Sequence, residues 1–214
     1  MYFQKNHLEK ILLKAKKLID ENLIGDIIHM HGHYGHGGRP GMENEWRSYK
    51  KYSGGGELLD QGVHLIDLAI FFQGFPEKVY GLTENLLWDI EVEDSSSFIL
   101  HHKNKKHSLF SVGWIYWKNK FEVSIYGELG YLQISGLGGS YGREKLIIGI
   151  RNLKGGKPKT QTFYFNNDDN SWRKEWKFFK KIVKNKDYID NGLQANLVVD
   201  AIYKSSNNKT EIKL

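Results

Sequence analysis

Apolar residues near the start of the chain recur at steps of three and four, the spacing of one helical face. They are Leu8, Ile11, Leu12, Ala15, Leu18 and Ile19, with lysines between them. Asn22 and Gly25 end this predicted helix, and a strand is expected over residues 26–34. A second helix is predicted to begin at the triple glycine of residues 54–56. It is apolar around most of its circumference, so we expect it to be buried.

Beyond residue 77 the hydrophobic period changes to two, which is typical of strands with one buried face. Strands are predicted over residues 78–88, 96–102, 107–117, 121–126, 131–135, 145–150 and 160–165. Because short turns separate them, consecutive strands should be antiparallel neighbours in a meander. Helices at about 172–184 and 192–205 and a last strand at 210–214 follow.

This order of elements predicts an α+β fold, with a large, mostly antiparallel open sheet and helices packed on one face. No linker or internal repeat divides the 214 residues, so we expect a single domain over residues 1–214. The strands carry more apolar residues than the two faces of a monomeric sheet need, which predicts a symmetric homodimer packed through the sheet. These residues are Val79, Phe98, Leu100, Phe110, Val112, Trp114, Ile125 and Phe163.

The amino-acid composition excludes several classes of protein for this chain. Hydrophobic residues make up 40% and charged residues 26%, a globular balance. The chain has no cysteine, which excludes disulfides and thiolate metal sites and fits a cytoplasmic location. No apolar run approaches the ~18 residues of a membrane span. The net charge of +6 is spread along solvated helix faces, so we expect neither nucleic acid nor a membrane as a partner.

A stretch of about twenty residues between the first strand and the second helix breaks the pattern, and a loop of this length is uncommon unless it is functional. It contains Arg39, Trp46 and Arg47. Guanidinium groups suit a phosphate or carboxylate, and an indole suits the face of a sugar, so these residues are candidates for binding an anionic sugar or nucleotide sugar. The alternative is that Trp46 packs in the interior and the arginines lie on the surface.

Histidines alternate along the strand before this loop. His29, His31 and His33 should face one side of the strand, with His36 just beyond it. Imidazoles at this spacing can converge on a metal ion. We favour instead a partly buried polar stripe that faces the substrate cleft, with His33 as its candidate substrate contact, and we expect no metal.

The densest cluster of chemically useful residues opens the second helix. Asp60 and His64 are one helical turn apart, and Asp67 continues the same face. A carboxylate beside an imidazole can orient the ring, raise its pKa and make it a general base. The alternative is a buried polar pair with a structural role.

Residues 54–67 read Gly-Gly-Gly-Glu-Leu-Leu-Asp-Gln-Gly-Val-His-Leu-Ile-Asp. This segment resembles the signature Gly-Gly-Gly-x-Leu-x-Asp-x-Gly-x-His-x-x-Asp of the Gfo/Idh/MocA oxidoreductases. Further segments, at residues 14–25, 46–47, 126–130 and 190–205, are similar to the family in the same order. The resemblance covers the C-terminal domain of these enzymes. It implies a broad antiparallel sheet whose open face packs against a partner subunit.

The resemblance also implies roles. His64 would take the proton of the hydroxyl that is oxidised, Asp60 would orient His64, and Lys5 would lie near the nicotinamide of NAD or NADP. The substrate would be a sugar, nucleotide sugar or polyol. A non-catalytic assembly module, or a redox-neutral relative that cleaves glycosides with NAD, stays open as an alternative.

Two family elements have no counterpart in the sequence. These are the N-terminal Rossmann domain with its glycine-rich phosphate loop and a Glu-Lys-Pro element. Residues 136–139, Gly-Leu-Gly-Gly, do not lie between a strand and a helix, as a dinucleotide fingerprint requires. We therefore expect the isolated chain to be inactive and to hold no cofactor tightly, with the Rossmann domain deleted or supplied separately.

Overall fold

The computed structural model describes residues 9–165, 171–185 and 191–214, which include one nine-stranded sheet and five α-helices. The strands are β1 Ile27–Gly35, β2 Lys78–Glu84, β3 Ser95–His101, β4 His107–Gly113, β5 Lys120–Gly127, β6 Gly130–Ser135, β7 Lys145–Ile150, β8 Lys159–Tyr164 and β9 Ile212–Lys213. The helices are α2 Glu9–Asp20, α3 Lys50–Ser53, α4 Val63–Gln73, α5 Ser171–Asn185 and α6 Asn191–Asn208. The predicted α+β class is confirmed.

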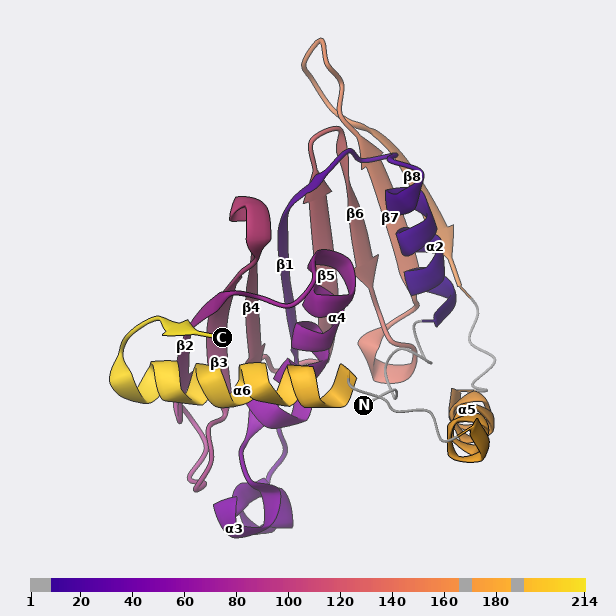
Figure 1. Ribbon diagram of the computed structural model, residues 1–214. Helices are drawn as coiled ribbons and strands as arrows, with labels where there is room; N and C mark the ends of the chain where they lie inside the picture. Colours follow the sequence, from indigo (N-terminus) through magenta and orange to yellow (C-terminus); the bar gives the residue numbers. More distant parts are fainter. Residues whose placement is uncertain (1–8, 166–170, 186–190) are drawn as a thin grey trace.

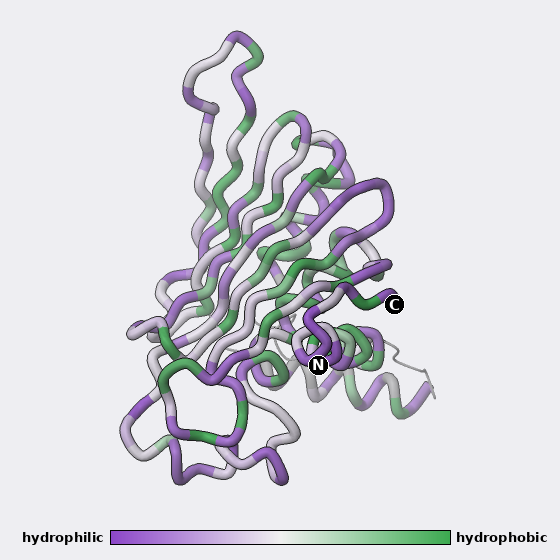
Figure 2. The backbone as a smooth tube through the Cα atoms, turned by 90° about the vertical axis from the view of Figure 1, so that its left-hand side faces the viewer, coloured by the Kyte–Doolittle hydropathy of each residue, from purple (hydrophilic) through white to green (hydrophobic). Residues whose placement is uncertain are grey.

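Helices α2, α4 and α6 lie on one side of the sheet (Figure 1). The perpendicular view shows the strands side by side with the helices behind them (Figure 2). Helix α4 packs on β1, α6 packs on β2, and α2 reaches β7. None of the helices in the described part of the chain has the length and apolar character that crossing a membrane would require.

The strand order is β8-β7-β6-β5-β1-β4-β3-β2-β9, so β1 is inserted between β5 and β4. It runs antiparallel to β5 and parallel to β4, with His29 opposite His107. The expected continuous meander is therefore wrong at one step. Two meanders, β2–β4 and β5–β8, are joined by β1, and residues 114–119 cross the strand that separates them.

The strand expected to reach residue 88 stops at Glu84. Beyond it the chain turns, and a carboxylate from a neighbouring segment binds the backbone of that turn. Both oxygens of the fully buried Asp94 accept backbone N–H groups of the following residues. The donors are Leu86, Leu87 and Trp88, at 2.9, 2.8 and 2.9 Å. These bonds satisfy backbone groups that would otherwise need a neighbouring strand.

The core lies between the inner face of the sheet and the helices. It contains most of the residues from which we predicted a sheet-packed dimer: Val79, Phe98, Leu100, Phe110, Val112 and Ile125. Trp114 is buried in a separate small cluster with Met42 and Val92, and Phe163 is half-buried. The apolar excess therefore covers the inner face, under the helices, and that argument for a dimer is wrong.

Candidate active site

The helix that carries Asp60 and His64 begins with a π-helical turn, Leu58–Gly62, and continues as α4. The N–H of Val63 donates to the carbonyl of Leu58, five residues earlier. A π turn holds more residues than an α turn, and such turns are frequent at functional sites. Asp60 therefore lies within the π turn, and His64 lies in the first turn of α4.

Asp60 lies at a small pocket of about 160 Å³ that the expected loop borders. Its walls include Trp46, Arg47, Gly55, Gly56 and Trp114. The loop is not irregular throughout, because it folds into short helical turns at Met42–Asn44, Trp46–Ser48 and Lys50–Ser53. These turns bring two of the sequence-predicted substrate residues to the edge of the helix.

The charges at this pocket are arranged around Arg47. Its Nε lies 4.0 Å from Oδ2 of Asp60, and its guanidinium group lies 4.6 Å from the ring centre of Trp46. The side chain of Asp60 is 50% exposed and Trp46 is 55% exposed, so both present surface to a ligand. The arrangement combines an aromatic face, a cation and a carboxylate, which together can hold a polar ring.

His64 is half-buried, and its ring centre lies 6.4 Å from that of Tyr34. Burial lowers the pKa of His64 from 6.5 to about 4, so the ring is neutral near pH 7 and can accept a proton. Among the described residues, Asp60 forms an ion pair with Arg47 and none with His64. His64 also does not line the pocket that contains Asp60.

The remaining predicted site residues lie elsewhere. Arg39 is bound to Glu45, with 2.8 Å between Nη2 and Oε1, and does not line the pocket. His33 also lies outside the pocket wall, with its ring 6.1 Å from that of Tyr116. Burial lowers the pKa of His33. Lys5 lies outside the described residues.

The histidine stripe faces one side of β1, as the alternation predicts. His29 lies 5.6 Å from His31 and 4.5 Å from His107, measured between ring centres, and both rings stack near Tyr126. Burial, followed by the neighbouring His107, lowers the pKa of His29. The part of the chain that the structure describes has no group of three or more metal-binding side chains placed to share an ion.

Sequence reasoning missed Glu57, directly before the π turn. The residue is fully buried, and neither carboxylate oxygen has a hydrogen-bond partner among the described residues. Burial, together with the carboxylates of Asp60 and Glu93, raises the pKa of Glu57 well above its usual value. A glutamate placed between the three glycines and the apolar Leu58 and Leu59 is the signal that could have drawn attention to it.

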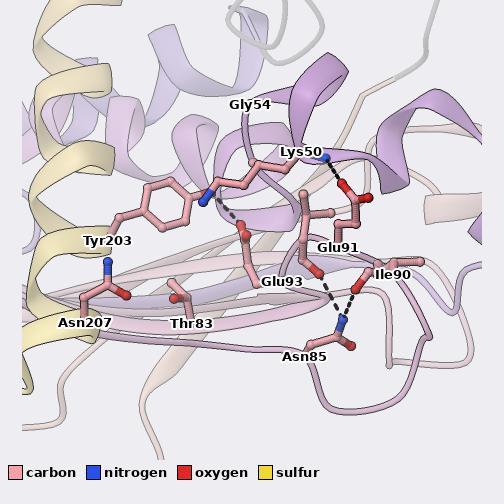
Figure 3. A pocket seen from close by; sticks show the side chains of 11 residues that line it. Lys50, Gly54, Thr83, Asn85, Ile90, Glu91, Glu93, Tyr203 and Asn207 are labelled. Atoms are coloured by element: carbon pink, nitrogen blue, oxygen red, sulfur yellow. Dashed lines mark hydrogen bonds between the residues drawn. The ribbon is translucent and has the colours of Figure 1, made fainter.

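Sequence reasoning also missed Glu93 and Tyr203, which hold the glycine segment in place. Oε1 of Glu93 accepts hydrogen bonds from the N–H groups of Gly56 and Leu58, at 3.0 and 3.1 Å. It accepts a third from the hydroxyl of Tyr203, at 2.7 Å (Figure 3). Burial and the Glu93 carboxylate raise the pKa of Tyr203. The three elements meet only in the folded chain, so sequence spacing could not reveal this contact.

His36, named in the sequence only as a flanking residue, lies close to the pocket. Its Nδ1 accepts the N–H of Gly38 at 3.0 Å, and its ring centre is 6.2 Å from that of Trp114. Burial lowers the pKa of His36, while the carboxylate of Asp60 opposes that shift. His36 is therefore a further neutral imidazole near Asp60.

Comparisons with known proteins agree with this architecture. Residues 12–133, more than half of the chain, match the family described as the GFO/IDH/MocA C-terminal domain. The chain therefore belongs to the GFO/IDH/MocA family. A Schizosaccharomyces pombe protein described as an uncharacterized oxidoreductase is 28% identical over 109 residues, which are 50% of this chain and 29% of that protein.

Solved structures share the fold. Levoglucosan dehydrogenase in complex with NADH matches with a TM-score of 0.83 and 18% identity, covering 99% of this chain and 64% of the enzyme. Aldose-aldose oxidoreductase from Caulobacter crescentus, complexed with glycerol, matches with a TM-score of 0.79 and 21% identity, covering 100% of this chain and 62% of that protein. The chain thus spans under two thirds of the length of these proteins.

Proposed function

We propose that this chain is the substrate-binding and oligomerisation half of an NAD(P)-dependent oxidoreductase, folded as a single domain, that acts on a hydroxyl of a sugar, nucleotide sugar or polyol. Its family membership supports the oxidoreductase class. The pocket in which Trp46, Arg47 and Asp60 meet supports the substrate class, because it offers an aromatic face and two charged groups to a polar ring. The names of two structural neighbours, which refer to levoglucosan and aldoses, point to the same class.

The size of the pocket bears on the cofactor. About 160 Å³ has room for one ring, either the substrate or a nicotinamide, and not for a whole dinucleotide. Most dinucleotide affinity comes from a pyrophosphate resting on a glycine turn at a helix N-terminus. The residues here therefore fit the reacting end of NAD or NADP, and the remainder of the cofactor would be held outside this site.

The roles of the residues follow from charge and burial. NAD or NADP, when bound, supplies the hydride acceptor. His64 is neutral near pH 7 because burial lowers its pKa, so it takes the hydroxyl proton at its unprotonated ring nitrogen. Asp60 accepts hydrogen bonds from substrate hydroxyls, and Arg47 holds Asp60 and any anionic group of the substrate. Closure of the site around a substrate would have to bring His64 to the same hydroxyl.

A second candidate is a non-catalytic assembly module. The observation that favours it is the missing contact between Asp60 and His64, since a working pair would be expected to share the substrate hydroxyl. In both proposals the open face of the sheet contacts a second copy of the chain. Tyr80, Leu82 and Leu109 are apolar or aromatic residues exposed on strands β2 and β4 and could form such a contact.

Complementation tests the enzymatic proposal. The chain would be mixed with, or fused to, the nicotinamide-binding part of levoglucosan dehydrogenase and assayed for NAD reduction with levoglucosan and aldoses. We expect weak or no NAD binding by the chain alone, turnover by the combination, and loss of turnover in His64→Ala. Turnover that persists in His64→Ala would remove the assigned role, and a stable but inactive combination would favour the assembly module.

A further inference from the structure

A second, larger cavity of about 490 Å³ also borders the glycine segment, and Asp60 does not line it. It opens between the C-terminal helix α6, the end of β2 and the segment that leads into β3 (Figure 3). Its lining includes Lys50, Thr83, Asn85, Glu91, Tyr203 and Asn207. Its volume falls in the range of small-molecule sites.

Several hydrogen-bonding groups in this cavity have no partner within residues 9–165, 171–185 and 191–214. Glu93 uses Oε1 for three hydrogen bonds, whereas Oε2 accepts none from the described residues. Asn85 donates through Nδ2 to the carbonyls of Ile90 and Val92, at 2.6 and 3.2 Å, which leaves its Oδ1 available. Glu91 uses one carboxylate oxygen to accept the N–H of Lys50, at 3.0 Å.

Donors are available as well. Within the described part of the chain, the ammonium group of Lys50 forms no ion pair, and the side chain of Asn207 forms no hydrogen bond. Both line the cavity. The cavity wall therefore carries both acceptors and donors, and its charged groups are the carboxylates of Glu91 and Glu93 and the ammonium group of Lys50. A ligand that donates and accepts at many points without a strong charge fits this wall better than an anion does.

The wall between this cavity and the Asp60 pocket is thin. Gly55 lines both, Gly54 lines the larger cavity, and Gly56 lines the smaller one. A Cβ atom at Gly55 would overlap the hydroxyl of Tyr203, and one at Gly56 would overlap the carbonyl oxygen of Glu93. Tyr203 and Glu93, which line the larger cavity, therefore press directly on the backbone that borders Asp60.

We infer that the cavity beside Tyr203 and Asn207 is a second binding site, for a small uncharged hydroxyl-rich molecule, and that its occupant is coupled to the Asp60 pocket through Gly55 and Gly56. A ligand there competes for Glu93, whose Oε1 accepts the N–H groups of Gly56 and Leu58, and for Tyr203, whose hydroxyl donates to the same oxygen. A shift in those bonds moves the start of the helix that carries Asp60. The site goes beyond the proposed function, because it lies outside the pocket that would hold the substrate.

The test is a titration of the full chain, labelled with ¹⁵N, with myo-inositol and separately with glycerol. Calorimetry gives affinity, and the backbone amide signals of Gly54, Gly55, Gly56 and Asp60 report the coupling. We expect saturable binding of at least one probe with a dissociation constant of about 1 mM or tighter. The amide signals on both sides of the glycine wall should shift along the same saturation curve.

Two variants make the result specific. Asn207→Leu places an apolar side chain in the cavity, whereas Asn208→Leu makes the same change at the next exposed residue of α6, which does not line it. We expect a loss of affinity of at least tenfold in the first and no change in the second. The absence of saturable binding, or binding unaffected by Asn207→Leu, would overturn the site. Binding that leaves the signals of Gly56 and Asp60 unmoved would overturn the coupling.

Arg47→Ala separates this proposal from the enzymatic one. Arg47 lines only the Asp60 pocket of the two cavities. Probe binding that is lost in Arg47→Ala and retained in Asn207→Leu would locate the ligand at Asp60, which would support the proposed substrate pocket and overturn the second site. Binding retained in Arg47→Ala and lost in Asn207→Leu supports the second site, whatever the outcome of the complementation assay.

Discussion

The hydroxyl of Tyr203 donates to Oε1 of Glu93 at 2.7 Å, joining residues that are 110 positions apart in the sequence. The same oxygen accepts the N–H groups of Gly56 and Leu58, so one carboxylate links the C-terminal helix to the start of the helix that carries Asp60. This contact decides where the glycine segment lies, and the segment in turn forms a wall of the candidate active site.

Tyr203→Phe should therefore destabilise the protein without creating a large cavity in the core. The ring stays, and one hydrogen bond to a charged group is lost, which costs about 1.5–3 kcal/mol of the free energy of unfolding. Urea denaturation measures the change. Tyr52→Phe, at an exposed tyrosine, is the matched control and should have no effect. Equal stability of both variants would show that the Tyr203–Glu93 contact is not made in solution.

Glu57 should make stability depend on pH in a known direction. Burial raises its pKa in the folded protein, so the folded state holds a proton that the unfolded chain releases above about pH 4.3. Stability is then greatest below that pH and falls as the pH rises toward the folded pKa. Glu57→Gln removes this dependence. In denaturation curves from pH 4 to 8, the free energy of unfolding of the variant should rise relative to that of the wild type as the pH increases.

Glu43→Gln, a change at an exposed residue, serves as the control for that experiment and should run parallel to the wild type. If the stability of Glu57→Gln depended on pH in the same way as that of the wild type over this range, the result would contradict the buried, protonated state of Glu57.

His64 should act in the opposite direction. Burial lowers its pKa to about 4 in the folded protein, against about 6.5 in the unfolded chain. Above pH 6.5 the ring is neutral in both states and does not change the free energy of unfolding; as the pH falls, the unfolded chain gains a proton first, which lowers that free energy by about 3 kcal/mol at pH 4. His64→Asn should therefore lose less stability than the wild type between pH 7 and pH 4. NMR titration of the ring protons of His64 gives the pKa directly, and a value near 6.5 would refute the prediction.

Arg47 and Arg39 should differ in their effect on ligand binding, although the sequence makes both of them candidates. Arg47 lines the pocket and lies 4.0 Å from Asp60, whereas Arg39 is bound to Glu45 outside it. We expect Arg47→Ala to weaken the binding of an anionic sugar, such as a nucleotide sugar, by about tenfold or about 1.4 kcal/mol. Arg39→Ala should leave the affinity unchanged. If calorimetry showed a larger loss of affinity in Arg39→Ala than in Arg47→Ala, the ligand would bind outside this pocket.

Association through the open face of the sheet can be tested at Leu109, which is 46% exposed in the middle of β4. Leu109→Lys places a charge at the proposed contact between two copies and should convert a dimer to a monomer in light scattering. Leu13→Lys, on the exposed face of α2, is the control and should leave the dimer intact. A wild-type protein that is monomeric at micromolar concentration would remove the proposed interface.

The sequence by itself determined the elements and the chemistry of individual residues. Hydrophobic periods of 3.6 and 2 are local properties, so the first helix, the buried second helix and the positions of most strands were predictable from it. The segment from Gly54 to Asp67 carries a family pattern in consecutive residues, so it indicates the class of protein without any knowledge of contacts between distant residues. Short turns also predicted the antiparallel neighbours correctly, except at β1.

The tertiary structure alone decided which distant segments meet. β1 lies between β4 and β5 because strand pairing depends on contacts far apart in the chain, which turn lengths do not encode. Asp60 pairs with Arg47 and lines a pocket whose wall does not include His64, although the spacing of Asp60 and His64 favoured a shared face. Glu93 and Tyr203 become neighbours only when α6 packs against the sheet, because a side-chain hydrogen bond across 110 residues leaves no periodic trace in the sequence.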